Sequence, residues 1–278
     1  MTSTHAISTT RLELNSGGSI PQVGLGVWQA PAGAATREAV TAALRFGYRH
    51  IDTARIYNNE TDVGIAIRES GVPRDQIFVT TKLWNADHGY DNALRAFDAS
   101  AQRLGLDYID LYLIHWPVPE QRLDSWRALE QLFEAKRART IGVSNYLVPH
   151  LEELLPHAKH LPAVDQIELS PFLQRRDTVA LCRKHGIVLA AYSPLTRGQR
   201  LDHPVVRAIA SELGRSAAQV LLRWGIQQEF VVLPKSVRAE RIAENGSVFD
   251  FVLDARQMQR LDDLDENLAT GWNPADQP

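Results

Sequence analysis

The chain has 278 residues, of which 44% are hydrophobic, and its formal net charge at pH 7 is −3. That length lies within the range of a single α/β barrel, and the apolar fraction is enough to bury a substantial core. The nearly balanced charge excludes a strongly basic protein that binds nucleic acid or membrane surfaces by electrostatics. Cys182 is the single cysteine, which excludes an internal disulfide and a cysteine-rich metal site and indicates a reducing compartment.

The sequence shows no sign of export or membrane insertion. The N-terminal stretch "MTSTHAISTTRLEL" has no basic region followed by an apolar core, so we expect no secretory signal. No uninterrupted apolar run approaches the ~18 residues of a membrane-spanning helix. No linker or low-complexity tract divides the chain. We therefore expect a cytoplasmic protein with one domain over residues 1–278.

Short apolar runs typical of strands alternate with longer segments of helical period along the chain. The eight expected strands are 23–28, 48–53, 77–84, 109–116, 140–145, 164–169, 187–193 and 230–236. Helical segments such as "TREAVTAALRFG" and "DNALRAFDASAQRLG" lie between them, and several end on Gly, as helices often do. This alternation predicts parallel strands with right-handed crossovers. Eight such units predict an α/β fold, a (β/α)8 TIM barrel, which we favour over an open, doubly wound sheet.

Polar residues gather where the expected strands end, and this is where a barrel places its active site. Asp52, Lys82 and His115 lie at or near the ends of the second, third and fourth strands, and Tyr57 follows the second. Each has an ordinary explanation as a loop cap, a solvated lysine, a hydrogen-bonded core histidine or a rim aromatic. The barrel favours a functional group of four, because it points all of them toward one opening.

These four residue types suit proton donation to a carbonyl oxygen. A free tyrosine has a pKa of about 10, which is too high for efficient proton donation near neutral pH. An adjacent ammonium lowers that pKa by stabilising the phenolate, and a buried carboxylate can hold the ammonium in place. We therefore predict that Asp52 orients Lys82, that Lys82 lowers the pKa of Tyr57, and that Tyr57 is a general acid. His115 would orient the carbonyl or share in proton delivery.

No internal nucleophile accompanies this group. The sequence contains no G-x-S-x-G elbow, no H-E-x-x-H motif and no Cys–His pair at a plausible strand end. An external hydride donor would supply the missing attack on the carbonyl carbon. A metal-dependent barrel hydrolase is less favoured, because it needs several His, Asp or Glu ligands at strand ends. We expect no metal.

A candidate phosphate site follows the eighth strand, in "VVLPKSVRAERIAEN" (231–245). Lys235, Ser236, Arg238 and Arg241 place three cations and a hydroxyl around the start of a helix expected near Arg238. Helix N-termini favour phosphate, and TIM barrels often bind it after strands seven and eight. The cations suit a monoester phosphate such as the 2′-phosphate of NADP. A solvated basic helix start is the alternative.

Aromatic residues lie beside the expected opening of the barrel. Trp28, Trp84 and Trp116 each follow or end a strand, and Tyr192 ends the seventh. Tryptophans also fill barrel rims for packing alone. In a functional role, the tryptophans would wall an apolar-sided substrate pocket and Tyr192 would stack on a nicotinamide ring.

Seven ordered blocks of the sequence resemble those of the aldo-keto reductases over nearly the whole chain. They are "GYRHIDTARIYNNE", "TTKLW", "DLYLIHWP", "IGVSN", "QIELSP", "YSPL" and "LPKSVRAERIAEN". Within the family, "SNYLVPHLEEL" and "PKSVRAERIAEN" are most similar to the bacterial 2,5-diketo-D-gluconate reductase group. The resemblance implies an NADPH-dependent carbonyl reductase on a (β/α)8 barrel.

The resemblance also implies roles for individual residues. The catalytic tetrad of the family carries over as Asp52, Tyr57, Lys82 and His115, with Tyr57 as the proton donor. The implied cofactor contacts are Ser144, Asn145 and Gln166 on the carboxamide, Tyr192 on the nicotinamide ring, Ser193 and Leu195 on the pyrophosphate, Lys235, Ser236, Val237 and Arg241 on the adenosine phosphate, and Glu244 and Asn245 beside the adenine. The implied substrate-pocket aromatics are Trp28, Trp84 and Trp116.

Four positions depart from the pattern of the family. Lys136 stands where a glycine turn is common, and Asp165 replaces the usual Asn before Gln166. Thr196 and Arg197 follow "YSPL", where small residues or glycine are common, so Arg197 would add a phosphate contact or change how this loop closes. The tail "NLATGWNPADQP" is short and does not assign the substrate.

The leading expectation is therefore a monomer that reduces small-molecule aldehydes, ketones or dicarbonyls, including 2,5-diketo-D-gluconate and methylglyoxal, with NADPH. The alternative is a cofactor-binding regulatory barrel without significant turnover. That alternative is disfavoured because all four tetrad residues are present, and a regulatory barrel need not keep them.

Overall fold

The computed structural model describes residues 10–274. Eight parallel strands lie side by side in the order β10-β9-β8-β7-β6-β5-β4-β3. Their bounds are β3 Leu25–Gly26, β4 His50–Asp52, β5 Phe78–Leu83, β6 Ile109–Ile114, β7 Ala138–Ser144, β8 Val164–Glu168, β9 Val188–Tyr192 and β10 Val231–Leu233. Parallel bridges from Val23 to Val232 and from Gly26 to Lys235 join the first strand to the last. The predicted (β/α)8 barrel is confirmed, and the open sheet is excluded.

The first and last strands are shorter than the apolar runs that predict them. Pro234 has no backbone N–H, so the ladder cannot continue regularly through it. Gly24 and Gly26 instead donate at 3.0 Å to the carbonyls of Val232 and Pro234. A Cβ at Gly24 would lie 2.7 Å from His50 Nδ1 and 2.8 Å from Cδ2 of Leu233, which ends β10. Glycine at this position therefore permits the close approach that closes the barrel.

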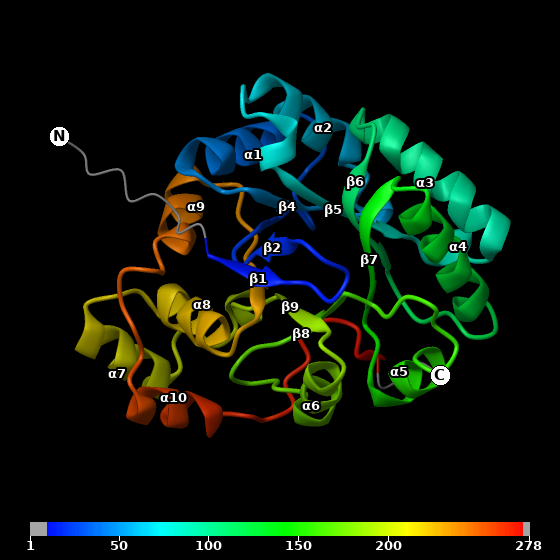
Figure 1. Ribbon diagram of the computed structural model, residues 1–278. Coiled ribbons are helices and arrows are strands. Elements are labelled where there is room, and N and C mark those ends of the chain that lie inside the picture. Colours follow the sequence, from blue (N-terminus) through cyan, green and yellow to red (C-terminus); the bar gives the residue numbers. More distant parts are fainter. Residues whose placement is uncertain (1–9, 275–278) are drawn as a thin grey trace.

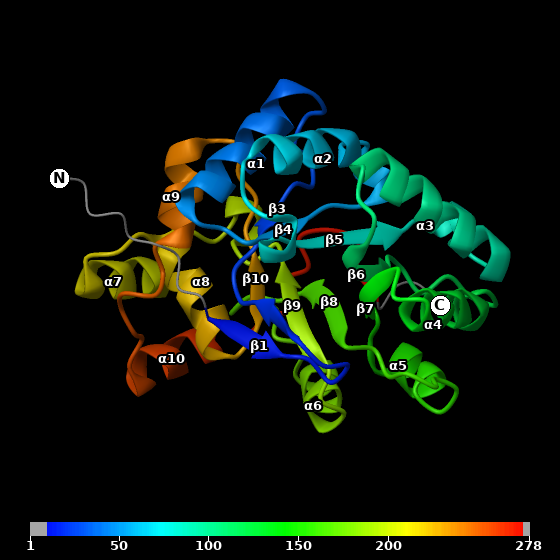
Figure 2. The same cartoon turned by 45° about the horizontal axis from the view of Figure 1, so that its top comes forward.

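Helices surround the strands, as Figures 1 and 2 show. They are α1 Ala34–Phe46, α2 Glu60–Glu69, α3 Tyr90–Leu104, α4 Arg122–Glu134, α5 Val148–Leu154, α6 Arg176–Lys184, α7 Pro204–Leu213, α8 Ala217–Gln227, α9 Ala239–Gly246 and α10 Ala255–Asp262. The helix α3 is typical: it buries Ala93, Phe97, Ala101 and Leu104, which recur at the helical period. No helix within residues 10–274 is long and apolar enough to cross a membrane.

A β-hairpin that the sequence analysis did not predict covers one end of the barrel. It consists of β1 Arg11–Glu13 and β2 Ser19–Pro21 and lies across the centre of the ring in Figure 1. Ile20 belongs to an apolar cluster with Phe78, Val164 and Val231, which begin their strands. The hairpin therefore closes the amino-terminal end, here called the base, and the carboxyl ends of the strands form the opposite end, here called the mouth.

Side chains alternate between the two faces of each strand. In β5, Val79 packs in the outer core under the helices, whereas Phe78 belongs to the cluster inside the barrel. Inward positions are apolar near the base and polar near the mouth, where Lys82 lies in β5 and Gln166 in β8. The predicted domain over residues 1–278 includes residues 1–9 and 275–278, which lie outside the described residues.

Candidate active site

A buried ion pair lies at the centre of the mouth. Asp52 ends β4 and Lys82 lies in β5, and the Lys82 side chain is fully buried. Lys82 Nζ donates to Asp52 Oδ1 at 2.7 Å, to the Thr53 carbonyl at 2.9 Å and to Tyr57 Oη at 3.5 Å. All three N–H groups of the ammonium therefore have acceptors, as a buried charge requires. The structure brings Asp52, Lys82 and Tyr57 into direct contact.

A tight turn presents Tyr57 to this pair. Residues Arg55–Tyr57 form a 3₁₀ turn, in which Tyr57 N donates to the Ala54 carbonyl at 3.0 Å. Asn58 then adopts φ 56°, a left-handed conformation that Asn tolerates better than most residues and that ends the turn. The chain can then enter α2 directly at Glu60. The spacing of five residues between Asp52 and Tyr57 thus corresponds to one short turn beyond the strand.

The pKa of Tyr57 corrects one prediction. Burial raises the pKa of Tyr57 well above its ordinary value of 10.0, and the charges of Asp52 and Tyr192 raise it further. The prediction of a lowered pKa is therefore wrong, because desolvation of the phenolate outweighs the stabilising effect of the nearby ammonium. Burial also lowers the pKa of Lys82, against the opposing charge of Asp52. Tyr57 consequently keeps its proton throughout the physiological pH range.

His115 is the fourth tetrad residue, and it lies beside Tyr57. Its ring contacts the Tyr57 ring edge-on, at 5.8 Å between centroids, and the Trp84 ring at 5.5 Å. Burial, and then the charge of Lys82, lower the pKa of His115 well below 6.5. The imidazole is therefore neutral at physiological pH. Its Nδ1 is buried and has no hydrogen-bond partner among the described residues.

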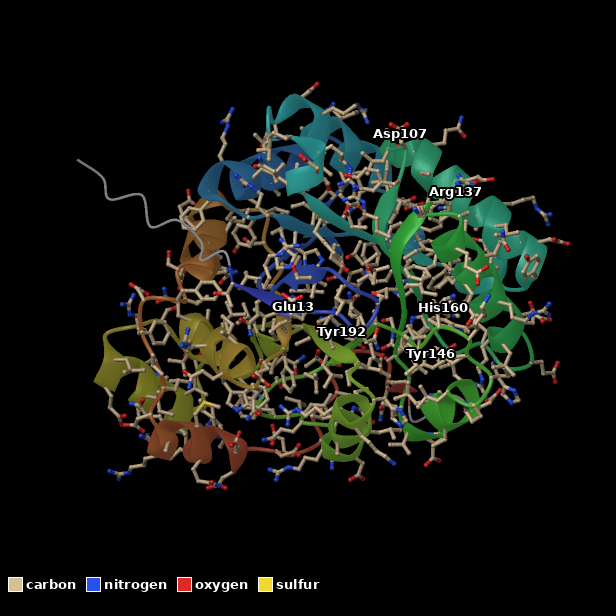
Figure 3. The ribbon with its side chains drawn as sticks, viewed as in Figure 1. Glu13, Asp107, Arg137, Tyr146, His160 and Tyr192 are labelled. Atoms are coloured by element: carbon tan, nitrogen blue, oxygen red, sulfur yellow. The ribbon has the colours of Figure 1, made fainter. Side chains whose placement is uncertain are left out.

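The three residues expected to contact a carboxamide lie in one hydrogen-bonded chain with Asp52. Gln166 Nε2 donates to Asp52 Oδ2 at 2.7 Å, and the backbone carbonyl of Gln166 accepts from Ser144 Oγ at 2.7 Å. Asn145 Nδ2 donates to the His115 carbonyl at 2.9 Å, and Asn145 Oδ1 accepts from Tyr192 Oη at 2.8 Å. In Figure 3, Tyr192 lies near the middle of the ring of strands. Amide and hydroxyl groups thus converge beside the tetrad.

The candidate phosphate site lies where β10 leads into α9. Lys235, Val237 and Arg241 are exposed, and Ser236 is 9% exposed. Ser236 Oγ accepts from the backbone N–H of Arg238, the residue that precedes α9, at 3.0 Å. The hydroxyl therefore shapes the loop that begins the helix. Exposed cations beside a helix N-terminus form a donor set suited to phosphate.

The other expected cofactor contacts lie on the two elements that flank this site. Ser193 follows β9 with φ 46°, and its carbonyl accepts from Thr196 N at 2.8 Å. The Leu195 side chain packs against the core. On α9, Asn245 is buried and Glu244 is half-buried. Because β9 and β10 pair directly, these residues lie at the same end of the barrel as the phosphate site.

Three of the four residues that depart from the family pattern have a left-handed backbone conformation. Lys136, Thr196 and Arg197 have φ of 58°, 50° and 51°. Glycine reaches this left-handed region without steric cost, which explains why small residues are common at these positions. Arg197 Nη1 donates to the Thr270 carbonyl at 2.8 Å, and its guanidinium lies 4.7 Å from the centre of the Trp28 ring. Arg197 therefore joins the loop after β9 to the tail and to Trp28.

The fourth departure, Asp165, lies on the outer face of the barrel. It is fully buried. Burial raises its pKa well above 3.8. Its Oδ2 faces Cys182 Sγ at 3.9 Å, and its Oδ1 has no hydrogen-bond partner among the described residues. A protonated acid has nearly the shape and polarity of the usual Asn, so the barrel accommodates it.

Four tryptophans, three of which were expected, surround the mouth. Trp28 is 40% exposed, and Trp84 packs on His115. Trp116 contacts Trp272 at 5.9 Å between ring centroids, and Trp272 is 69% exposed. The tail carries Trp272 there because Thr270 hydrogen-bonds Glu168 Oε1 through both its N–H and its hydroxyl. The sequence analysis missed Trp272; a lone tryptophan in a polar tail was its signal.

No group of three or more His, Cys, Asp or Glu residues within the described range is arranged to hold a metal ion. The convergent groups at the mouth are one ion pair, one protonated tyrosine and one neutral histidine. Such a set can donate a proton and polarise a carbonyl, and it lacks a nucleophile of its own.

Comparisons with known proteins agree with this geometry. The model of the aldo/keto reductase family matches residues 22–266. The chain is 52% identical to an aldo-keto reductase of Mycolicibacterium smegmatis, over 95% of this chain and 96% of that protein. It is 48% identical to glyoxal reductase of Bacillus subtilis, over 95% of each. The crystal structure of Bombyx mori aldo-keto reductase in complex with NADP has a TM-score of 0.89 and 36% identity, over 95% of each chain.

Proposed function

The chain belongs to the aldo/keto reductase family, and from that premise we propose that it is an NADPH-dependent carbonyl reductase with Tyr57 as its general acid. Family membership makes the protein an oxidoreductase. The observation that carries the assignment of Tyr57 is the set of contacts made by the Lys82 ammonium, which reaches both Asp52 and Tyr57 Oη from a fully buried position. This arrangement suits proton donation, because a hydroxyl that accepts from the ammonium keeps its own proton available for a substrate.

The residues at the mouth fit NADPH, which supplies a hydride to the carbonyl carbon when it is bound. Lys235 and Arg241 are exposed beside the N-terminus of α9, and they would hold the 2′-phosphate. The remaining contacts that we propose are Ser144, Asn145, Gln166, Tyr192, Ser193, Leu195, Ser236, Val237, Glu244 and Asn245. The Bombyx mori relative, whose structure holds NADP, supports this cofactor.

Lys82 controls the direction in which Tyr57 gives up its proton. Because Lys82 donates to Tyr57 Oη, the hydroxyl hydrogen of Tyr57 points away from the ammonium and toward the carbonyl oxygen of a substrate. As that proton leaves, the phenolate forms beside a fixed positive charge in a site with little water, where electrostatic stabilisation is strong. Neutral His115 would donate a hydrogen bond to the same oxygen and orient it. Asp52 holds Lys82 in place.

The substrates that we propose are aldehydes, ketones and dicarbonyls, with methylglyoxal and 2,5-diketo-D-gluconate among them. The relative named glyoxal reductase supports the dicarbonyl class. Trp28, Trp84 and Trp116 would wall the pocket and favour an apolar flank on the substrate. We further propose that the protein acts as a cytoplasmic monomer.

Turnover of the Tyr57→Phe variant tests the proposal. Without the hydroxyl, kcat should fall by about 10²- to 10⁴-fold, while NADPH binding, followed by quenching of protein fluorescence, stays near that of the wild type. The substrates would be methylglyoxal, 2,5-diketo-D-gluconate and an aromatic aldehyde. Tyr108→Phe is the matched control, because Tyr108 lies at the base of the barrel, where its ring contacts Arg74 and Arg139.

Two results would contradict the proposal. Near-normal kcat in Tyr57→Phe would remove Tyr57 as the general acid. Tight NADPH binding by the wild type without turnover of any of these carbonyls would instead favour the regulatory barrel.

A further inference from the structure

The loop that carries Trp28 contains a strained tight turn. Ala30 N donates to the Val27 carbonyl at 3.0 Å, so Val27–Ala30 form a β-turn with Trp28 at its second position. Gln29, at the third position, has φ 57°, a conformation that glycine or asparagine adopts with less strain. A strained turn persists only where its surroundings hold it. The question is which group holds this one.

Asn59 holds both ends of the turn. Its side-chain Nδ2 donates to the Val27 carbonyl at 3.0 Å and to the Ala30 carbonyl at 3.4 Å. These are the first and last residues of the turn. Asn59 is fully buried, and it lies between the 3₁₀ turn of Tyr57 and the start of α2. One primary amide therefore satisfies the two carbonyls that flank Trp28.

The other half of the same amide is connected to the tetrad. Asn59 Oδ1 accepts from Thr53 Oγ1 at 2.8 Å, and the Thr53 carbonyl accepts from Lys82 Nζ at 2.9 Å. The carbonyls of Val27 and Ala30 can only accept, so the NH₂ group of the amide must face them and its oxygen must face Thr53 Oγ1. The Trp28 turn and the Lys82 ammonium are thus joined through two buried residues, the side chain of Asn59 and the hydroxyl and backbone carbonyl of Thr53.

We propose that Asn59 is a positioning residue that sets the place of Trp28 relative to the tetrad and thereby the affinity for the carbonyl substrate. The proposal rests on the proposed function, in which Trp28 walls the substrate pocket. It assigns no chemical step to Asn59, which touches neither Tyr57 Oη nor the reacting atoms. The expected signature is therefore a change in KM larger than the change in kcat.

Asn59→Asp is the most direct variant, because it keeps the shape and replaces the donor with an oxygen that faces two carbonyls. The Trp28 turn should loosen, so hydrogen exchange at the amides of residues 27–30 should accelerate by about tenfold or more. The KM for methylglyoxal or an aromatic aldehyde should rise about tenfold, because small displacements of positioning groups have large effects on rate and binding. The kcat should change by less than about threefold.

Gln102→Glu is the matched control, because it also exchanges a side-chain amide for an acid. Gln102 is exposed on α3, outside the turns that carry Tyr57 and Trp28. It should leave both the exchange rates at residues 27–30 and the KM unchanged. Where Asn59→Asp does not fold, Thr53→Val serves instead: it removes only the hydroxyl that orients Asn59, and it should change KM in the same direction by a smaller factor.

A double mutant separates positioning from general damage. If Asn59 acts through Trp28, then Asn59→Asp should raise KM no further in a Trp28→Ala background, and the two effects will be non-additive. Additive effects on KM, or unchanged exchange at residues 27–30 in Asn59→Asp, would overturn the proposal. Hydrogen exchange needs no turnover, so this result stands apart from a failure of the wild type to reduce carbonyls, which would overturn the proposed function.

Discussion

Each end of the barrel contains a buried aspartate paired with basic side chains, and the two ends differ in how far those basic side chains are exposed to water. At the mouth, Asp52 meets Lys82, whose side chain is fully buried. At the base, Asp110 of β6 meets Arg74 at 2.6 Å and Arg139 at 3.4 Å, and these guanidiniums are 23% and 49% exposed. Both partners of the Asp52–Lys82 pair are thus buried, whereas at the base only Asp110 is buried and its arginines are partly exposed.

The surroundings of the basic side chains explain this difference. The guanidiniums of Arg74 and Arg139 both lie over the ring of Tyr108, at 4.1 Å and 3.7 Å from its centre. Both are partly exposed, so water helps to stabilise their charge. Lys82 has no such help, and burial lowers its pKa against the pull of Asp52. A buried ion pair is weak evidence for stability, since desolvation offsets much of its attraction. Under the proposed function, the mouth retains one because Tyr57, as the general acid, needs a cation that water does not screen.

The largest expected effect comes from replacing one basic residue at each end of the barrel in turn. Lys82→Met should lower kcat by about 10³-fold, because the phenolate of Tyr57 loses its fixed positive charge. It should also destabilise the fold by about 3 kcal/mol, because Asp52 keeps a buried charge for which Gln166 is the one remaining side-chain partner among residues 10–274. Arg74→Met should cost about 2 kcal/mol in urea unfolding, because Arg139 still faces Asp110. Its kcat should stay within about twofold of the wild type.

The comparison fails if Arg74→Met lowers kcat as strongly as Lys82→Met at temperatures where both variants are folded. Circular dichroism at the assay temperature provides that check. Equal losses would mean that the two ends of the barrel are coupled and that the mouth has no special need for an unscreened cation.

The sequence predicts the barrel well, for a physical reason. Each of its eight strands is an apolar run bounded by turns, and burial on both faces makes such runs easy to see. The hairpin was missed because β1 and β2 have three residues each and β1 is largely exposed. The first and last strands were predicted too long. Pro234 and the glycines of the first strand interrupt the regular backbone pairing but not the run of apolar residues.

The sequence predicts which polar residues meet at the mouth but not their electrostatics. Asp52, Lys82, His115 and Tyr57 stand out in the sequence because charged and polar residues at strand ends are unusual. The direction of the pKa shift of Tyr57 was wrong, since it depends on how deeply the ring is buried, and no spacing encodes that depth. Asn59 was missed for a similar reason: "NNE" is typical of a solvated loop, and only the fold shows that one of its two asparagines is buried between two carbonyls.

A second prediction concerns His50, a buried histidine that begins β4 inside the barrel. Burial, chiefly, lowers the pKa of His50 to about 3, and the charges of Lys82 and Arg11 contribute. Below the ordinary histidine pKa of about 6.5, His50 therefore binds a proton in the unfolded chain but not in the folded chain. Folded stability is fully present above that pH and falls as the pH drops toward 3, by up to about 1.4 kcal/mol per pH unit.

Urea unfolding at several pH values between 7 and 4 measures this slope. His50→Gln should make the slope shallower, because glutamine can keep the hydrogen bond that His50 Nε2 makes with Thr80 Oγ1 and does not titrate. His157→Gln, at an exposed position, should leave the slope unchanged. Identical slopes in the wild type and His50→Gln would show that the barrel interior admits the proton after all.

The smallest expected effect tests whether the cations at the mouth await an anion. At the base, Asp110 neutralises Arg74 and Arg139, whereas within residues 10–274 neither Lys235 nor Arg241 forms an ion pair. Arg241→Ala should therefore raise the Kd for NADPH about tenfold, the worth of one charged hydrogen bond, and leave the Kd for NADH within about twofold. Arg256→Ala, an exposed arginine on α10, should change neither. Equal weakening of both dinucleotides would mean that Arg241 shapes the loop and does not read the 2′-phosphate.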